Sequence, residues 1–128
     1  MLYTYINRKG DSPFAQWLVE IENKEPSVYH KVCSILQHME NHDLPLEPPN
    51  VRRMIKRTGN HSLYKIRVGK FRLFFVMKNN NYYLLHTFRK SSQKTPEKEI
   101  KQVVREVNED NYQPANFKVT SGEITFLK

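Results

Sequence analysis

Cysteine, glycine and long apolar runs are all scarce in this sequence. Cysteine occurs once, at Cys33, so no disulfide can form within the chain, and we expect a cytoplasmic setting. No apolar stretch approaches the roughly 20 residues of a membrane helix, and the N-terminus lacks the pattern of a secretion signal. The four scattered glycines do not form a glycine-rich loop that cradles phosphates. These absences argue against a disulfide scaffold, a membrane protein and a P-loop nucleotide binder.

Acidic residues are missing from the middle of the chain. From Pro48 to Pro96, 49 residues contain no Asp or Glu but hold 12 of the 21 Lys and Arg residues. The middle therefore carries +12 and the flanks −4, which together give the net charge of +8. Because a solvated surface normally mixes both signs of charge, this segment indicates a surface for a polyanion. Its basic residues are Arg52, Arg53, Lys56, Arg57, Lys65, Arg67, Lys70, Arg72, Lys78, Arg89, Lys90 and Lys94.

What is present suits one globular domain. The chain has 128 residues, of which 38% are hydrophobic, with seven Tyr, seven Phe and one Trp. Single domains commonly contain about 100 to 150 residues, and this apolar content is too high for a disordered chain. We expect one domain over residues 1–110 and a C-terminal extension over residues 111–128.

Two helices are predicted in the first third of the chain. Ser12-Pro13 supplies an N-cap followed by proline at the first helical position. Apolar residues at i, i+3, i+4 and i+7 from Phe14 then form one helical stripe. A second helix starts at Pro26 and runs to about His42, and the short connection predicts an antiparallel pair. The proline-rich residues 43–50 form a connector.

The pattern then changes to strands. After the connector, β-branched and aromatic residues recur with period two, which predicts an antiparallel meander. Thr95-Pro96 repeats the cap-then-proline signal and opens a third amphipathic helix. With a first strand at residues 2–6, the fold class is a small α+β domain, a meander packed against two N-terminal helices and one C-terminal helix. Ser121-Gly122 marks the turn of a short hairpin in the extension. The meander strands are predicted at 52–55, 61–68, 71–77 and 82–88.

A two-residue turn at Gly69-Lys70 sets the register of the central hairpin. In that register Arg67 lies opposite Arg72, and Lys65 stands on the same face. Like charges paired across strands destabilise a sheet unless an anion lies between them, so we expect an anion site. The alternative is that both guanidinium groups extend into water or reach acids elsewhere. Tyr64, Ile66, Val68, Phe71, Leu73 and Phe75 form the opposite, apolar face.

The placement of His86 depends on the asparagine-rich turn at residues 79–81. A three-residue loop puts His86 and Lys90 on the face of Arg67, whereas a two- or four-residue loop sends them to the apolar face. His86 is therefore a candidate acid-base group, with a hydrogen-bonded structural histidine as the alternative.

The acid-free segment disfavours some kinds of catalysis and allows another. A metal-dependent nuclease needs carboxylates to hold Mg²⁺, and the segment offers none. Cys33 lies on an apolar helical face, where a buried thiol is the ordinary interpretation, and the histidines form no metal-ligand pattern. We therefore expect neither metal nor cofactor. RNA can still be cleaved, since its own 2′-hydroxyl is the nucleophile and cationic side chains stabilise the charged phosphate.

Two segments in fixed order resemble the RelE/ParE superfamily of type II toxins, most closely its phage-related HigB-like branch. The first, from Ser62 to Val76, is a leucine-tyrosine strand, a glycine turn and an arginine after an aromatic residue. The second, from Leu84 to Pro96, holds Leu-Leu-His, basic residues and Lys-Thr-Pro before the last helix. The resemblance covers residues 1–110. It implies a ribosome-dependent endoribonuclease that cleaves translated mRNA and is held inactive by a cognate antitoxin, with a helix-turn-helix domain and an adjacent gene expected for the antitoxin.

The resemblance also implies which residues work on RNA. Lys65 and Arg67 match in Tyr-Lys-Ile-Arg, Arg72 matches in Phe-Arg, and Lys90 or its neighbour Arg89 matches at the end of the last strand. Arg67 and Arg72 would bind and neutralise the scissile phosphate. Lys65 would assist at the nucleophile, and Lys90 would support the transition state or the leaving group.

One position departs from the family pattern. RelE has a tyrosine near the start of the last helix that helps to activate the substrate, and residues 93–97 contain none. The proton-transfer group is therefore open among Lys65, Lys90 and His86. The remaining basic residues expected to bind RNA are Arg52, Arg53, Lys56, Arg57, Lys70, Arg89 and Lys94.

Two other functions stay open at this stage. The first is a gyrase-directed poison on the same fold, as in ParE-type members, in which the basic strands need not be catalytic. The second is a non-enzymatic RNA-binding phage module that only holds phosphates.

Overall fold

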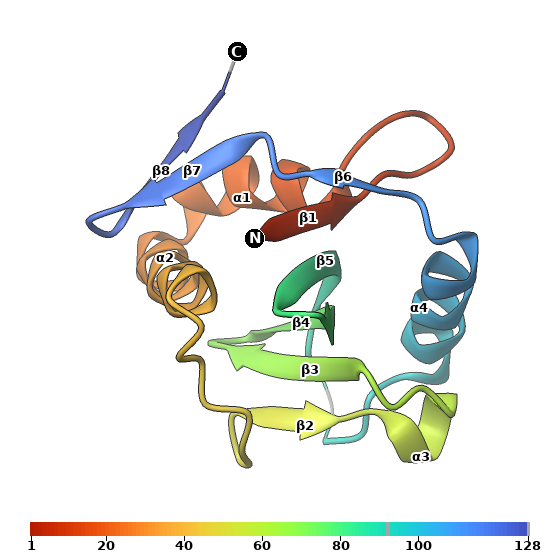
Figure 1. The fold of residues 1–128 in the computed structure, drawn as a ribbon. Helices are drawn as coiled ribbons and strands as arrows, with labels where there is room; N and C mark the ends of the chain where they lie inside the picture. The colour runs from red at the N-terminus through yellow and green to blue at the C-terminus, as the bar shows by residue number, and fades with distance from the viewer. Residues whose placement is uncertain (92, 128) are drawn as a thin grey trace.

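The computed structural model describes residues 1–91 and 93–127, so Ser92, within the second matched segment, and Lys128, at the end of the extension, lie outside the described residues. A six-stranded sheet with the strand order β2-β3-β4-β5-β1-β6 forms its centre (Figure 1). The strands are β1 (Leu2–Tyr5), β2 (Val51–Arg53), β3 (Leu63–Val68), β4 (Phe71–Lys78), β5 (Asn81–Arg89) and β6 (Tyr112–Pro114), with a separate hairpin of β7 (Phe117–Thr120) and β8 (Glu123–Phe126). The helices are α1 (Pro13–Lys24), α2 (Pro26–Glu40), α3 (Ile55–Thr58) and α4 (Glu97–Glu109).

The first two helices form where the sequence predicts them. Ser12 caps α1, because its hydroxyl oxygen accepts a hydrogen bond from the Ala15 amide at 3.1 Å. The apolar stripe that begins at Phe14 is buried in the core. α2 begins at Pro26 as predicted and ends at Glu40, two residues before the predicted end.

Helices cover both faces of the sheet. α1 and α2 lie on one face and α4 on the other (Figure 1). The predicted apolar face of the β3–β4 hairpin packs under α1 and α2, and the predicted pairing of Arg67 with Arg72 is confirmed. On the α4 face, Leu63 and Phe74 join a second apolar cluster with Ile100 of α4. The sheet face that carries Lys65 is therefore apolar where α4 covers it and basic outside that area.

The turn between β4 and β5 has two residues, Asn79-Asn80, which by itself predicts that His86 points to the apolar face. That prediction is wrong. A β-bulge between Leu73 and Phe75 shifts the register by one residue and so reverses which face the rest of β5 presents. The His86 ring consequently contacts Phe74, on the α4 side of the sheet.

Most predicted boundaries move by one or two residues in the structure, and two of these shifts have a clear local cause. The strand predicted at 52–55 ends at Arg53, since the buried Met54 donates its amide to the Leu63 carbonyl and starts the single turn of α3. The last helix begins at Glu97, with Pro96 rather than Thr95 at the N-cap position. The Thr95 hydroxyl has a different partner, described below.

The first strand of the chain and the strand that follows α4 lie side by side at one edge of the sheet. β1 lies beside β5 in parallel orientation, which the sequence pattern did not indicate. β6, from the start of the extension, pairs with β1 in antiparallel orientation and closes that edge. The extension thus contributes to the main sheet before it forms its own hairpin (Figure 1).

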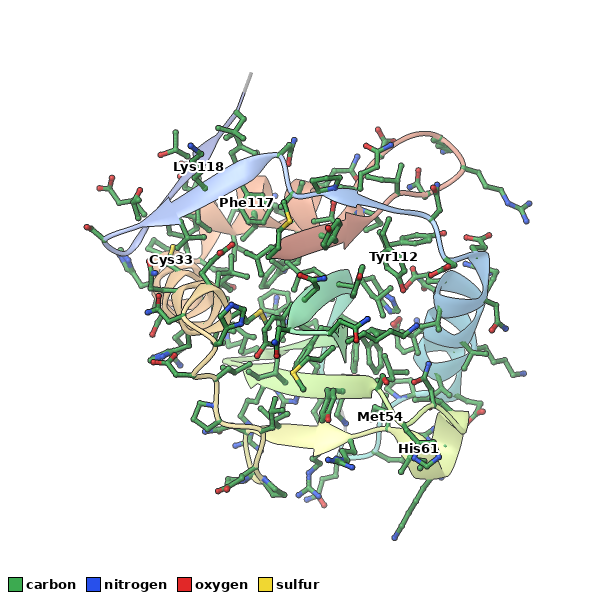
Figure 2. All side chains as sticks on the ribbon, viewed as in Figure 1. Cys33, Met54, His61, Tyr112, Phe117 and Lys118 are labelled. Carbon is green, nitrogen blue, oxygen red and sulfur yellow. The ribbon has the colours of Figure 1, made fainter. Side chains whose placement is uncertain are left out.

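The hairpin predicted around Ser121-Gly122 is present and packs beside the N-terminal helices. Phe117 on β7 is 5% exposed, and its ring centre lies 6.0 Å from that of Phe14 in α1 (Figure 2). Ile124 on β8 joins the same cluster. The extension therefore completes the apolar core that α1 and α2 begin.

Phe117→Ala should lower the free energy of unfolding by about 3 kcal/mol, because it removes a buried ring and leaves a cavity. Urea denaturation followed by the fluorescence of Trp17, the one tryptophan of the chain, measures this change. Phe126→Ala is the matched control, since Phe126 is 38% exposed on the same hairpin, and it should cost less than about 1 kcal/mol. Equal losses for both variants would show that the hairpin does not anchor through Phe117.

Candidate functional site

Basic side chains from three strands and the following loop gather at one end of the sheet. The register pairs Arg52 with Lys65 and Arg67 with Arg72, so two cross-strand rows of like charge lie side by side. Lys90, just after β5, lines the same depression. We call these five residues and the space between them the cationic cleft. It opens into a hollow of about 950 Å³ along β2 and α3.

Lys65 stands at the centre of the cationic cleft. Its ammonium group donates a hydrogen bond of 2.5 Å to the hydroxyl oxygen of Thr95. Burial removes part of the water around the ammonium group, and the positive charges of Lys90 and Arg72, among others, repel it. Together these effects lower the pKa of Lys65 to about 8. A lysine with such a pKa exchanges protons near neutral pH, as acid-base catalysis requires.

Arg72 is held rigidly at the β3–β4 turn. Its Nη1 donates hydrogen bonds to the carbonyl oxygens of Gly69 at 3.0 Å and Phe71 at 2.8 Å. The residue is 9% exposed, and burial together with the charge of Arg67 lowers its pKa. A guanidinium has five N–H donors, and these two contacts use only those of Nη1, so the group keeps donors for an anion.

Lys90 and Arg89, at the end of β5, lie on opposite sides of the sheet. Lys90 lines the cationic cleft, and partial desolvation and the charges of Arg72 and Arg67 lower its pKa. Arg89 pairs with Phe71, and its guanidinium carbon lies 5.8 Å from the centre of that ring, on the α1 side of the sheet. The structure therefore brings Lys90, and not Arg89, together with Lys65.

The other predicted RNA-binding residues are spread over several environments. Arg53 lies 5.8 Å from the Tyr64 ring centre, on the face opposite Lys65. Arg57 donates to the Thr95 carbonyl oxygen at 2.8 Å and to the Glu97 carboxylate at 2.9 Å, so it bridges α3 and the start of α4. Arg57 therefore has an acidic partner on the last helix. The remaining positions are Lys56 on the rim of the hollow, Lys70 beside Arg72 and Lys90, and Lys94 exposed on the loop before α4.

His86 does not line the cationic cleft and is buried under α4. Its Nδ1 lies 2.7 Å from Glu106 Oε1 and its Nε2 lies 3.4 Å from Glu99 Oε2. Glu106 also accepts a hydrogen bond from Gln102. Because both ring nitrogens face carboxylates and the side chain is 5% exposed, the arrangement is that of a residue that fastens α4 to β5.

Thr95 is a site residue that the sequence pattern does not reveal. The pattern predicts a helix cap at Thr95, whereas the residue is buried with its hydroxyl against Lys65 and its carbonyl against Arg57. The available signal was its place in Lys94-Thr95-Pro96 of the matched segment, where a proline next in the chain already supplies the helix start. Asn50 lines the cleft as well, and its carbonyl accepts the Arg67 amide.

Within residues 1–91 and 93–127, no group of three or more His, Cys, Asp or Glu side chains is placed to hold a metal ion. No helix in the described part of the chain combines the length and apolar character needed to cross a bilayer.

The fold and the cleft together define a class, a small RelE-like α+β domain whose sheet gathers like charges in one cleft. The model of a family described as "phage derived protein Gp49-like (DUF891)" matches residues 18–108, most of the chain. The chain belongs to this Gp49-like family, which is part of the wider RelE/HigB-like group of toxins. No curated protein matches the chain.

Proposed function

We propose that this protein is the toxin of a type II toxin-antitoxin system, of the HigB-like branch, and that it cleaves mRNA on the ribosome in the cytoplasm without a metal ion. The observation that carries the proposal is Lys65, an amine of lowered pKa enclosed by Arg52, Arg72 and Lys90. Such an array attracts a phosphodiester and offers it a base. Membership of a toxin-like phage family supports the biological role.

The proposed reaction uses the nucleophile that RNA carries. Arg67 and Arg72 bind the non-bridging oxygens of the scissile phosphate and offset the charge that develops on them. The neutral amine of Lys65 takes the proton of the 2′-hydroxyl as its oxygen forms a bond to phosphorus. The bond from phosphorus to the 5′-oxygen breaks, and the ammonium of Lys90 protonates that oxygen. The products are a 2′,3′-cyclic phosphate and a 5′-hydroxyl.

Lys65 suits the role of base better than the other candidates. His86 has carboxylates at both ring nitrogens and does not line the cleft, so it is not proposed as a proton-transfer group. Lys90 is more exposed than Arg72 and lines the cleft together with Lys65, which suits a donor to the leaving group.

The charge of the cleft also supports a proposed partner. A protein that silences the site must cover a surface where five cations meet, and acidic or helical segments of an antitoxin would do so. We propose that this antitoxin carries a helix-turn-helix domain and is encoded by an adjacent gene. Inspection of the neighbouring open reading frames checks this directly.

Induced expression of the protein without an antitoxin should arrest growth and translation. Mapping of mRNA 5′ ends after induction should show new ends inside translated codons, with 5′-hydroxyl groups, because the proposed reaction leaves that group. Arrest with intact mRNA and induced DNA damage would instead favour a gyrase poison. RNA binding without arrest would favour a module that only holds phosphates.

A further inference from the structure

The Lys65 ammonium group is surrounded by other positive charges, which disfavour a further positive charge at that position. Arg52 faces it from β2, Arg57 from α3, Arg72 from β4 and Lys90 from the end of β5, and all four carry the same sign of charge. Electrostatic repulsion alone would drive a flexible lysine chain out toward water, where its charge is best solvated. Some contact must therefore hold the ammonium inside the cleft.

Thr95 provides that contact. Its hydroxyl oxygen accepts the Lys65 hydrogen bond at 2.5 Å, and the residue is only 4% exposed. The backbone of Thr95 is itself anchored, because Arg57 donates to its carbonyl oxygen and also pairs with Glu97 in the first turn of α4. The acceptor thus comes from a fixed point, the junction of α3 and α4, and not from a mobile side chain.

The chemical type of this acceptor matters as much as its place. A carboxylate in the same position would also hold the ammonium, but its negative charge would stabilise the charged form of Lys65 and keep it protonated. A hydroxyl is neutral, and it can accept a hydrogen bond from the ammonium or donate one to the free amine. It therefore holds Lys65 in both protonation states.

We propose that Thr95 is the positioning residue of the cationic cleft, whose neutral hydroxyl keeps the Lys65 amino group among four like charges and so sets the pH range in which the site works. The part concerning cleavage rests on the proposed function. The part concerning the position and protonation of Lys65 does not depend on it.

The test uses three variants of the full chain, Thr95→Ser, Thr95→Val and Thr95→Asp, and the titration of Lys65 followed by NMR of its side-chain nitrogen. In the wild type and Thr95→Ser, Lys65 should titrate near pH 8, since both keep a hydroxyl. In Thr95→Val the released side chain should reach solvent, and in Thr95→Asp it should pair with the carboxylate. In both, its pKa should rise by about 1 to 2 units.

Cleavage of ribosome-bound mRNA supplies the second readout. The wild-type rate should rise with pH through about 8, because the base must be neutral, and the rise should move to higher pH in Thr95→Asp. Thr95→Val should lower kcat about 10-fold or more with little change in KM, and Thr95→Ser should restore it.

The titration of Lys65 and the cleavage of mRNA together distinguish failure of the positioning role from failure of the proposed activity. Lys65 titrating at the same or a lower pH in Thr95→Val, with an unshifted pKa in Thr95→Asp, would overturn the positioning role. Shifted titrations in a protein that cleaves no mRNA would retain that role and reject the proposed activity. If Thr95→Val fails to fold, Thr95→Ala takes its place, and a Lys65 pKa in Thr95→Ala that is no higher than in Thr95→Ser would overturn the positioning role.

Discussion

Arg72→Ala should abolish the growth arrest and lower the rate of mRNA cleavage by about 10²- to 10³-fold. Arg72 is the most buried cation of the cleft, and two backbone carbonyls hold it in place, so in the proposed reaction its charge would act on the phosphate at little cost in reorganisation. Removal of one donor that stabilises a developing negative charge typically has an effect of this size. Single-turnover cleavage of a ribosome-bound message measures it.

Arg89→Ala is the matched control for Arg72→Ala. It removes the same charge from the neighbouring strand, but its guanidinium lies against Phe71 on the opposite face of the sheet. It should leave cleavage within about 3-fold of the wild type, because general attraction of RNA changes only slightly when one distant charge is lost. Equal losses for Arg72→Ala and Arg89→Ala would mean that only the overall charge matters and that the cleft has no catalytic geometry.

Arg72→Lys refines the same experiment. It keeps the charge, but its three donors all lie on one nitrogen, so it loses the planar fork that can reach the turn carbonyls from one nitrogen and a phosphate from the others. We expect it to remain at least about 10-fold below the wild type. Full activity of Arg72→Lys would show that a point charge suffices and that the contacts to Gly69 and Phe71 have no part in the reaction.

His86→Leu should lower the free energy of unfolding by about 3 kcal/mol. It leaves the Glu106 carboxyl, which is 2% exposed, without its 2.7 Å partner in an apolar surrounding. Loss of one partner from a buried polar pair has a cost of this size, since the remaining group keeps its desolvation penalty. Chemical denaturation gives the value directly.

The double variant His86→Leu with Glu106→Leu shows whether the pair itself causes the loss. Removal of both polar groups should lower the free energy of unfolding by at least about 1 kcal/mol less than the sum of the two single changes, because residues in contact are energetically coupled. Strictly additive losses would show that the two side chains contribute only packing. Glu99→Gln should cost less than either single change, since its contact with His86 is longer, at 3.4 Å.

His86→Leu also separates stability from catalysis. A histidine that serves as the proton-transfer group would be needed for cleavage even where the protein is fully folded. In our account, His86 fastens α4 to β5, so the folded variant should keep most of the wild-type activity at low temperature. A folded but inactive His86→Leu variant would return His86 to the list of acid-base candidates.

Much of the fold followed from local patterns. The stripe from Phe14 and the cap at Ser12 defined α1, because helix formation depends on residues a few positions apart. The Gly69-Lys70 turn defined the β3–β4 register in the same way, and with it the opposition of Arg67 and Arg72. The place of β1 beside β5 was not predictable in this manner, since nothing near residues 2–5 specifies which distant strand they join.

The candidate site also has one part that the sequence predicts and another that depends on the tertiary structure. Lys65, Arg67 and Arg72 share a face because strands alternate, so the sequence alone places them together. One bulge in the β4–β5 pairing places Lys90 rather than Arg89 in the cleft and buries His86 under α4. No local sequence pattern predicts this bulge. Thr95 reaches Lys65 only because α3 and α4 meet at that point.

The sequence by itself determined that this protein concentrates positive charge on a hairpin without acids, because composition and strand alternation act over a few residues. Only the tertiary structure decided which of those charges meet, which one loses water and which neutral group holds it. Burial and electrostatic coupling depend on segments 30 or more residues apart that fold against one another, as Lys65 and Thr95 do. Burial and the neighbouring positive charges at that point give the site a lysine of pKa about 8.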